Sequence, residues 1–339
     1  SDMNTEKVLM ERNHVRFYKT PLYGGNGMQR IIQQWKYRRY VLEMLKNEYV
    51  KETTYLWLLH SETVSLFSAY LDKYDVISHL FEFKNPTQKI AYRLLNPCYP
   101  FEKNLKKSKK VICCEYNRAH ITKSIYDLDK VPYILPNKPY NGNVQIAQSL
   151  PFSIQEIISK YRNKKIILYQ GVFIPERRVD YFVRAVNSLP DDYILFLMGG
   201  ENPFYNELRD KCQSERIVFL PFLPPPLHLE ITKLAHIGIL VYVVDGEPIN
   251  RAINVLYCAP NKLYEYSMFG IPMISNNLPA LNFIFSKFEA GICTDILLEK
   301  NVCEAILEID RNYESYSKAS VQLYNSVDML DIVKGILRE

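Results

Sequence analysis

Short apolar runs alternate with longer amphipathic segments along most of the chain, and this alternation constrains the fold more than any other feature of the sequence. It is typical of parallel β-sheets whose strands are connected by crossover helices. Strands are expected at residues 14–20, 54–59, 74–79, 110–114 and 132–135, and again at 165–169, 193–198, 217–220, 237–243 and 271–275. The main helices are expected at residues 28–45, 178–189 and 261–269. The sequence therefore predicts an α/β protein.

A stretch rich in turn-forming residues divides this alternation into two halves. Residues 136–143 read Pro-Asn-Lys-Pro-Tyr-Asn-Gly-Asn, which is the composition of an interdomain linker. With 339 residues, the chain is long enough for two domains of ordinary size. We expect one domain at residues 1–140 and a second at residues 141–339, with a ligand bound in a cleft between them.

The charge of the chain limits the partners it can have. A net charge of +5 permits contact with anionic nucleotides or an anionic membrane surface, but it is too small to indicate a nucleic-acid-binding protein. The basic residues form one cluster, which is either a solvated helix end, the interpretation we favour, or an electrostatic docking site for an anionic leaflet. The cluster consists of Lys103, Lys106, Lys107, Lys109 and Lys110.

The cysteines and the apolar segments of the sequence indicate the cellular compartment in which the protein is expected. Seven cysteines without metal-ligand or paired spacing indicate reduced thiols in a cytoplasm, and no metal site. No signal peptide is recognisable, and no apolar run reaches transmembrane length. We therefore expect a cytoplasmic protein whose membrane contact, if it has any, is peripheral.

The most informative stretch is Ala259–Tyr266, which reads APNKLYEY and is followed by Gly-Ile-Pro. Asn261 is a plausible N-cap, so that free backbone N–H groups at the helix start would suit a diphosphate. Lys262 adds a positive charge there, and Glu265, one turn later, can accept hydrogen bonds from two vicinal hydroxyls of a ribose. The alternative is a capped helix with one solvated Lys–Glu pair.

The longer stretch APNKLYEYSMFGIPMISNNLPALNFI resembles the donor-binding segment of retaining GT-B glycosyltransferases of family 4. Residues 170–186 (QGVFIPERRVDYFVRAV) are similar to the strand–loop–helix at the start of that family's donor domain. The resemblance covers residues 130–330 well and the first half loosely. It implies the GT-B fold, which has two Rossmann-like domains facing each other across a cleft.

The resemblance also implies roles for individual residues on the donor side. Glu265 matches the glutamate that holds the nucleotide ribose, the backbone at Asn261 and Lys262 matches the diphosphate-binding helix start, and Arg177 matches a basic residue on the diphosphate. A guanidinium suits phosphate because it binds two oxygens at once. Other residues expected to bind the donor are Gly171, Gly199, Asn254 and Leu263.

Two positions depart from the family pattern. In the family, an arginine often follows the glycine that corresponds to Gly171, and here that position is Val172. The family's glutamate eight residues before Glu265 is replaced by Tyr257. That glutamate often contacts the transferred sugar, so the sequence leaves the donor sugar open.

Polar residues follow three of the expected strands in the first half. Because strand ends line the ligand crevice of an α/β sheet, these residues are expected on the acceptor side. They are His60 with Glu62, His79 with Glu82, and Glu115 with Arg118. Gly24-Gly25 is either a glycine loop of the kind found in this domain or a surface turn.

The resemblance implies transfer of a sugar, expected from a UDP-sugar and with retention of configuration. The expected acceptor is a glycan or a polyprenyl-diphosphate-linked glycan. The expected role is in surface polysaccharide (O-antigen or capsule) synthesis at the inner membrane face. No cofactor or metal is expected: Arg177 and Lys262 would stabilise the leaving diphosphate, while His60 or Glu62 would orient the acceptor. Alternatives are a non-catalytic nucleotide-sugar-binding subunit and a nucleotide-sugar epimerase. A Rossmann dehydrogenase is improbable because no Gly-x-Gly-x-x-Gly follows a strand.

Overall fold

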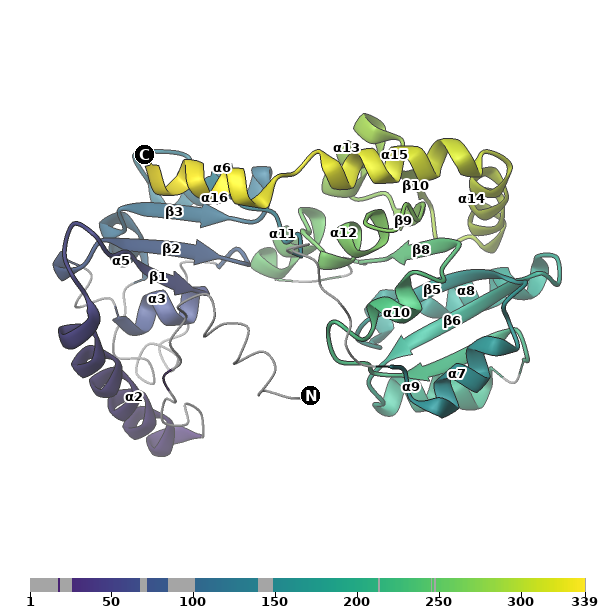
Figure 1. Cartoon of the computed structure of the whole chain (residues 1–339), viewed down its shortest axis with the longest axis horizontal. Coiled ribbons are helices and arrows are strands. Elements are labelled where there is room, and N and C mark those ends of the chain that lie inside the picture. Colours follow the sequence, from purple (N-terminus) through teal and green to yellow (C-terminus); the bar gives the residue numbers. More distant parts are fainter. Residues whose placement is uncertain are drawn as a thin grey trace. The chain divides into compact units, whose positions relative to one another are not determined.

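The computed structural model of this chain forms two compact units, Ser1–Ile134 (unit 1) and Leu135–Glu339 (unit 2), shown in Figure 1. The structure describes residues 18, 26–67, 72–84, 101–139, 149–212, 214–244, 246 and 248–338. The strand expected at residues 14–20, apart from Tyr18, and the Gly24-Gly25 loop lie outside the described residues.

Unit 1 contains a four-stranded parallel sheet in the order β1-β2-β3-β4. Its strands are β1 (Leu56–Leu59), β2 (Val76–Leu80), β3 (Lys110–Cys113) and β4 (Tyr133–Ile134). Its helices include α2 (Gly27–Glu48), α3 (Ser61–Phe67), α5 (Phe101–Lys107) and α6 (Tyr116–Tyr126). Strands β2 and β3 are buried along their whole length, as expected for a parallel sheet covered on both faces.

Unit 2 contains a six-stranded, fully parallel sheet in the order β10-β9-β8-β5-β6-β7. Its strands are β5 (Lys165–Gln170), β6 (Tyr193–Gly199), β7 (Ile217–Pro221), β8 (Ile237–Leu240), β9 (Met273–Asn276) and β10 (Gly291–Thr294). Its helices are α7 (Phe152–Ser159), α8 (Val179–Ser188), α9 (Pro203–Lys211), α10 (Leu229–Thr232), α11 (Ile249–Leu256), α12 (Asn261–Ser267), α13 (Pro279–Phe288), α14 (Glu299–Arg311), α15 (Tyr313–Asn325) and α16 (Met329–Arg338). A 3₁₀ turn, η2 (Pro175–Arg177), precedes α8.

Helices cover both faces of this sheet, so it has two hydrophobic cores. Successive side chains of a strand point to opposite faces. Ile166 and Leu168 of β5 accordingly pack in one core with α10, α12 and α13, whereas Ile167 and Tyr169 pack in the other with α8 and α14. Each fully buried residue of this kind contributes about 1.5–3 kcal/mol relative to exposure. This double burial explains why the strands are visible in the sequence as uninterrupted apolar runs.

The strand order of unit 2 reverses at β5, and this positions the site. The chain continues from β5 to β6 and β7 on one side, then returns to add β8, β9 and β10 on the other. Where strand order reverses in an open parallel sheet, a crevice opens at the carboxyl ends of the two central strands. Here those strands are β5 and β8.

Strand β8 ends earlier than the sequence predicts, because hydrogen bonds from a side chain replace those of a neighbouring strand. The predicted strand reaches Val243, whereas β8 ends at Leu240. Beyond it, the Asn276 side chain accepts from the Tyr242 N–H at 3.1 Å and donates to the Tyr242 carbonyl at 2.8 Å. The backbone at Tyr242 is thereby satisfied without a neighbouring strand.

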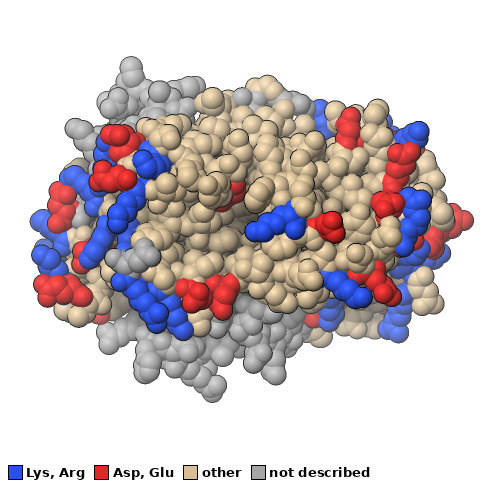
Figure 2. All heavy atoms as spheres, turned by 90° about the horizontal axis from the view of Figure 1, so that it is seen from above, with Lys and Arg blue, Asp and Glu red and all other residues tan. Residues whose placement is uncertain are grey.

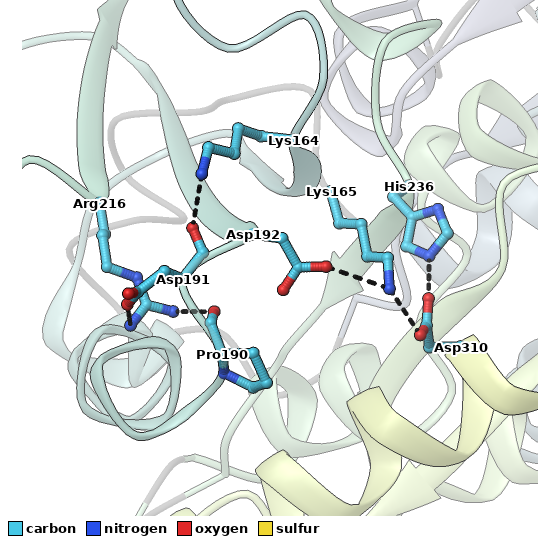
Figure 3. Close-up of polar contacts among 8 residues, drawn as sticks. All are labelled: Lys164, Lys165, Pro190, Asp191, Asp192, Arg216, His236 and Asp310. Atoms are coloured by element: carbon cyan, nitrogen blue, oxygen red, sulfur yellow. Dashed lines mark hydrogen bonds and ion pairs between the residues drawn. The ribbon is translucent and has the colours of Figure 1, made fainter.

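A charged cluster lies at the amino ends of β5 and β8 (Figure 3). Lys165 Nζ and His236 Nε2 both point at the Asp310 carboxylate, at 2.8 Å each, and Asp192 lies 3.2 Å from Lys165. His236 also stacks on the Tyr313 ring, with centroids 4.0 Å apart. Because Asp310 belongs to α14, the cluster ties this helix to the two central strands.

Candidate functional site

A cavity of about 650 Å³ opens at the carboxyl ends of the central strands of unit 2. The segments that line it follow β5, β6, β7 and β8, and the start of α12 completes it. Six residues predicted from the sequence to bind a donor line this one cavity: Gly171, Arg177, Gly199, Asn261, Lys262 and Glu265. Val172, which replaces the expected arginine, also lines it.

Two glycines allow the backbone to approach closely at the floor of this cavity. Gly171 has a φ of +145°, and a Cβ there would lie 3.0 Å from Lys262 Nζ. A Cβ on Gly199 would lie 2.1 Å from the Gly171 carbonyl oxygen. Side chains at these positions would strain the turn or clash with the backbone, so both positions need glycine.

Two cationic side chains share one aromatic ring in the cavity. The Arg177 guanidinium carbon lies 4.1 Å, and Lys262 Nζ 5.3 Å, from the centre of the Tyr242 ring. Arg177 Nη1 donates to the Val241 carbonyl at 3.2 Å. Within the described part of the chain, neither cation forms an ion pair with a carboxylate. The cavity therefore offers a guanidinium and an amine to an anionic occupant.

Lys262 is held in an environment that disfavours its charge. Burial, together with the nearby positive charge of Arg177, lowers the pKa of its amine to about 7. Glu265 and Cys258 act in the opposite direction. An anion bound in the cavity would restore the protonated form, so Lys262 favours an anionic occupant.

The helix that starts at the cavity differs in one detail from the prediction. The N-cap of α12 is Pro260 rather than Asn261, which is the first helical residue, and no side chain caps the helix. Proline has a fixed backbone angle and no hydroxyl, so it cannot supply a capping oxygen. The first N–H groups of α12 therefore have no capping side chain, and they stand at the edge of the cavity.

Glu265 is oriented by neighbours from both sides. Gln170 Nε2 donates to its Oε2 at 2.6 Å, and His228 Nε2 lies 3.3 Å from its Oε1. The buried Thr232 hydroxyl donates to Oε1 of the Gln170 side chain at 2.8 Å, and this hydrogen bond fixes the orientation of the side-chain amide. A carboxylate has about four acceptor positions. Glu265 thus keeps acceptor positions for two hydroxyls of a ligand while its rotamer is held.

Two residues predicted on the donor side lie elsewhere. The Leu263 side chain is buried in the core of unit 2, on the face of α12 that packs against the sheet. Asn254 lies on α11, a helix that the sequence did not predict, and it is outside the set of residues that line the cavity.

Sequence reasoning missed four residues that build the site. Gln170, His228 and Tyr242 line the cavity, and Thr232 supports Gln170 from behind it. The signal available for Gln170 was its position, since it is a polar residue at the carboxyl end of a buried apolar strand. His228, Thr232 and Tyr242 carry no such signal, because only the fold brings them to Glu265 and Lys262.

On the acceptor side, three of the predicted residues are accessible. His60 follows β1, is exposed and has a φ of +67°, which is rare outside glycine. Glu62 accepts from Lys84 Nζ at 3.1 Å; burial raises its pKa, but Lys84 and hydrogen bonds lower it more, to a net value below the usual range. Glu82 is exposed. His60 and Glu62 lie at the carboxyl edge of the unit 1 sheet.

The other three acceptor-side residues are engaged within unit 1. His79 is buried against Phe81, and burial, with the neighbouring His60, lowers its pKa to about 4, so its ring is neutral at neutral pH. Glu115 is the N-cap of α6 and accepts from the Arg118 N–H at 2.8 Å. The buried Arg118 guanidinium donates to the Phe81 carbonyl at 2.8 Å. These contacts hold the strand ends in place.

The lysine cluster predicted from the sequence is largely neutralised locally. Ion pairs join Lys106 to Asp127 at 2.7 Å, Lys107 to Asp72 at 2.7 Å and Lys109 to Asp75 at 3.2 Å. Lys110 is buried, and the Lys103 side chain lies outside the described residues. On the face shown in Figure 2, basic and acidic side chains are likewise interspersed. The structure agrees with a solvated helix end better than with a basic docking patch.

Among the described residues, no helix combines the length and the apolar character needed to cross a lipid bilayer. No group of three His, Cys, Asp or Glu side chains among them is arranged to hold a metal ion.

No family model matches the sequence, and no curated protein matches it. Solved structures do match the fold. HepE of Anabaena in complex with UDP-glucose is 12% identical, with a TM-score of 0.66 over 99% of this chain and 88% of HepE. WaaG, a glycosyltransferase involved in lipopolysaccharide biosynthesis, is 13% identical, with a TM-score of 0.60 over 93% of this chain and 84% of WaaG. Sucrose-phosphate synthase from Thermosynechococcus elongatus is 12% identical, with a TM-score of 0.64 over 96% and 81% of the two chains.

These neighbours are GT-B glycosyltransferases. The chain has the GT-B fold. The fold class predicted from the sequence, α/β of the GT-B type, is therefore confirmed. At identities of 12–13%, the likeness establishes architecture, and the activity has to be argued from the site itself.

Proposed function

We propose that this protein is a glycosyltransferase that binds a nucleoside diphosphate sugar in the cavity of unit 2. The observation that carries the proposal is the meeting of Arg177, Lys262 and Glu265 in one cavity at the strand reversal. Among the described residues, no carboxylate forms an ion pair with Arg177 or Lys262, which leaves both groups to a diphosphate, and an oriented carboxylate suits a ribose diol.

The size of the cavity agrees with such a ligand. Its volume of about 650 Å³ falls within the range of roughly 300–1,000 Å³ that is typical of small-molecule sites. Phe222 is exposed at its rim and offers a flat apolar surface to a nucleobase.

The proposed reaction places the developing charge next to the two cations. As the bond between the sugar and the diphosphate breaks, negative charge grows on the leaving oxygen and the sugar becomes oxocarbenium-like. Arg177, Lys262 and the N–H groups at the start of α12 would stabilise that charge. Because these groups belong to the protein, the proposal is a metal-independent transfer, and turnover is expected to survive EDTA.

The finer features of the proposal come from the sequence resemblance and the neighbours. HepE has been solved with UDP and with UDP-glucose, and WaaG takes part in lipopolysaccharide biosynthesis. We propose a UDP-sugar donor, retention of configuration as in family 4, and a glycan or polyprenyl-diphosphate-linked acceptor of surface polysaccharide synthesis. His60 and Glu62 are the proposed acceptor-orienting groups. The protein would act in the cytoplasm at the inner membrane face.

Substitution of Arg177 tests the proposal. In Arg177→Ala, we expect transfer of labelled sugar from the UDP-sugar to fall by a factor of tens or more, with the melting temperature unchanged within about 2 °C. Arg184→Ala is the matched control, because Arg184 is exposed on α8 and its contacts among the described residues, an ion pair with Asp180 and stacking on the Tyr181 ring, stay within that helix. Equal turnover in Arg177→Ala and wild type would remove this residue from the mechanism.

Two other outcomes would point to a different function. Tight UDP binding without transfer to any lipid-linked acceptor would indicate the non-catalytic subunit. Conversion of the donor sugar in the absence of an acceptor would indicate the epimerase. Calorimetry with UDP and product analysis without acceptor separate these two from the transferase.

A further inference from the structure

We propose that Asn137 and Lys138 are positioning residues, which hold helix α12 so that the amine of Lys262 meets a diphosphate in the cavity. Both belong to the stretch at residues 136–143 that the sequence predicts as a linker, and the structure places both in unit 2. The inference rests on the proposed function, because it concerns the same donor cavity. Neither Asn137 nor Lys138 lines that cavity, so they would act on it through α12.

Asn137 holds the turn that leads into α12. Its side-chain Nδ2 donates to the Ala259 carbonyl at 2.8 Å, across 122 residues of sequence. Ala259 comes directly before Pro260, the N-cap of α12, and three residues before Lys262. Pro260 supplies no capping hydrogen bond to the helix. The hydrogen bond from Asn137 therefore fixes the chain at the point where α12 begins.

Lys138, the next residue, is bound to the end of α15. Its Nζ donates to the carbonyls of Tyr324 and Val327, at 2.6 Å each. It also lies 3.7 Å from the centre of the Tyr324 ring. The carbonyls at the end of a helix carry partial negative charge, so an ammonium group binds them favourably. Two consecutive residues thus tie the linker to the start of one helix and to the end of another.

Helices α12 and α15 also pack directly against each other (Figure 1). Just beyond the end of α12, the buried Ser320 hydroxyl of α15 donates to the Ile271 carbonyl at 2.9 Å. The contacts therefore form a closed circuit. Asn137 holds the start of α12, α15 holds the chain after its end, and Lys138 holds the end of α15.

The Lys262 amine occupies a narrow place in the cavity. Its Nζ lies 5.1 Å from the centre of the Tyr169 ring and 5.3 Å from that of the Tyr242 ring. A Cβ on Gly171 would come within 3.0 Å of the same atom. The amine is thus set against two aromatic rings and a glycine. A displacement of the start of α12 would move it out of this place.

Glu265 lies on the same helix but is held independently of Asn137. Gln170 and His228 contact its carboxylate from two sides, as described above. A loosened start of α12 should therefore disturb Lys262 more than Glu265. This difference predicts a selective effect, in which binding of the diphosphate weakens and binding of the nucleoside does not.

The affinities for UDP, inorganic pyrophosphate and uridine test the inference. In Asn137→Ala, we expect the affinities for UDP and pyrophosphate to fall about fivefold, and the affinity for uridine to stay unchanged. Lys138→Met should act in the same direction by about threefold. Calorimetry measures UDP and pyrophosphate, and NMR titration measures uridine. The measurements are made well below the melting temperature of every variant, so that loss of stability does not enter.

Each substitution has a matched control in unit 2. Asn187→Ala replaces an exposed asparagine on α8 whose side chain accepts from Ser214 at 3.4 Å. Lys164→Met replaces an exposed lysine that, like Lys138, donates to a backbone carbonyl, that of Asp191 at 3.0 Å. Neither Asn187 nor Lys164 lines the cavity. Both controls should leave the three affinities unchanged.

A double-mutant cycle shows whether Asn137 acts through Lys262. In a Lys262→Met background, Asn137→Ala should weaken UDP binding no further, because the amine that it positions is gone. A full additional loss in that background would assign the effect of Asn137 to another group and overturn the inference.

Two further results would overturn it. An equal loss of UDP and uridine affinity in Asn137→Ala would mean that Asn137 supports the cavity as a whole. Affinities for UDP and pyrophosphate that neither Asn137→Ala nor Lys138→Met lowers would contradict this inference alone. A wild-type chain that binds neither UDP nor pyrophosphate would contradict the proposed function, and this inference with it.

Discussion

At the scale of single residues, Lys262 should make donor binding depend on pH. Its pKa is lowered to about 7 by burial and by the positive charge of Arg177. A bound diphosphate would raise this pKa again, so binding above neutral pH takes up a proton. Between the two pKa values, we expect the affinity for UDP to fall by up to about tenfold for each pH unit of increase.

Calorimetry in two buffers of different ionisation enthalpy measures that proton uptake. It should be close to zero at about pH 6, where Lys262 is already protonated in the free protein, and should rise towards one proton at about pH 8. In Lys262→Met the uptake should disappear, and the affinity should be lower and nearly independent of pH over that range. Proton uptake that persists unchanged in Lys262→Met would assign it to another group.

The residues that hold the Glu265 carboxylate in place give rise to a second prediction at this scale. Thr232 orients the Gln170 amide, which in turn donates to the Glu265 carboxylate. Thr232→Val keeps the shape of the side chain and removes its hydroxyl. Since hydrogen bonds to charged groups are worth roughly 1.5–3 kcal/mol, part of that energy should be lost from ribose binding. We expect UDP affinity to fall about fivefold, and affinity for 2′,3′-dideoxy-UDP to change little.

The matched control for Thr232→Val is Thr122→Val, which replaces an equally buried threonine of unit 1. It should leave the affinity for both nucleotides unchanged. If Thr232→Val weakened UDP and the dideoxy nucleotide equally, Thr232 would support the cavity as a whole rather than the ribose-binding carboxylate.

At the scale of elements, the sequence predicted strands well where both faces are buried. β6 was expected at residues 193–198 and is observed at Tyr193–Gly199, because every residue of it is apolar or glycine. The predicted end of β8 was wrong, because the position of that end depends on the Asn276 side chain, which comes from a different strand. Periodicity records burial, but it does not record which distant side chain satisfies a backbone group.

In the candidate site too, some contacts could be predicted from the sequence and others could not. Lys262 and Glu265 lie in one short helical motif, so their proximity followed from spacing along the chain. Gln170 and Thr232 are 62 residues apart, and Gln170 and Glu265 are 95 apart. Their meeting is a consequence of the strand order, which local patterns do not encode.

The cluster at the amino ends of β5 and β8 makes a prediction about stability. Burial raises the pKa of Asp310, but hydrogen bonds from Lys165 and His236 lower it more, so the net pKa lies below its ordinary value of 3.8. A carboxyl with a lowered pKa stabilises the fold at pH above its unfolded pKa, and this contribution is lost as the pH falls through the folded value. We expect Asp310→Asn to cost about 1–2 kcal/mol of unfolding free energy at neutral pH.

Urea unfolding of Asp310→Asn at several pH values checks this prediction. The difference from wild type should narrow once the pH falls below about 4, where the wild-type carboxyl also becomes protonated. Glu304→Gln is the control on the same helix, because the ion pair between Glu304 and Lys300 is exposed, and it should cost no more than about 0.5 kcal/mol. A difference that stays constant with pH would mean that Asp310 acts through packing.

At the scale of the whole molecule, the division of the chain assigns the donor to one unit. Each unit has its own parallel sheet, and unit 2 has two hydrophobic cores of its own. All the residues that line the cavity lie between Gln170 and Glu265, inside unit 2. Acceptor recognition was predicted on strand ends of unit 1. Donor binding and sugar transfer should therefore be separable.

A fragment of residues 135–339 should fold and bind UDP with nearly the affinity of the full chain, but it should not transfer sugar. With UDP at about 100 times its Kd, the fragment should gain about 2.7 kcal/mol of unfolding free energy, or roughly 5–10 °C in melting temperature for a domain of this size. Thermal unfolding with UDP, and with inorganic phosphate as the control, measures this gain. A fragment that unfolds cooperatively but gains nothing from UDP would mean that donor binding also requires unit 1. Transfer by the fragment alone would mean that the acceptor site is not where the sequence places it.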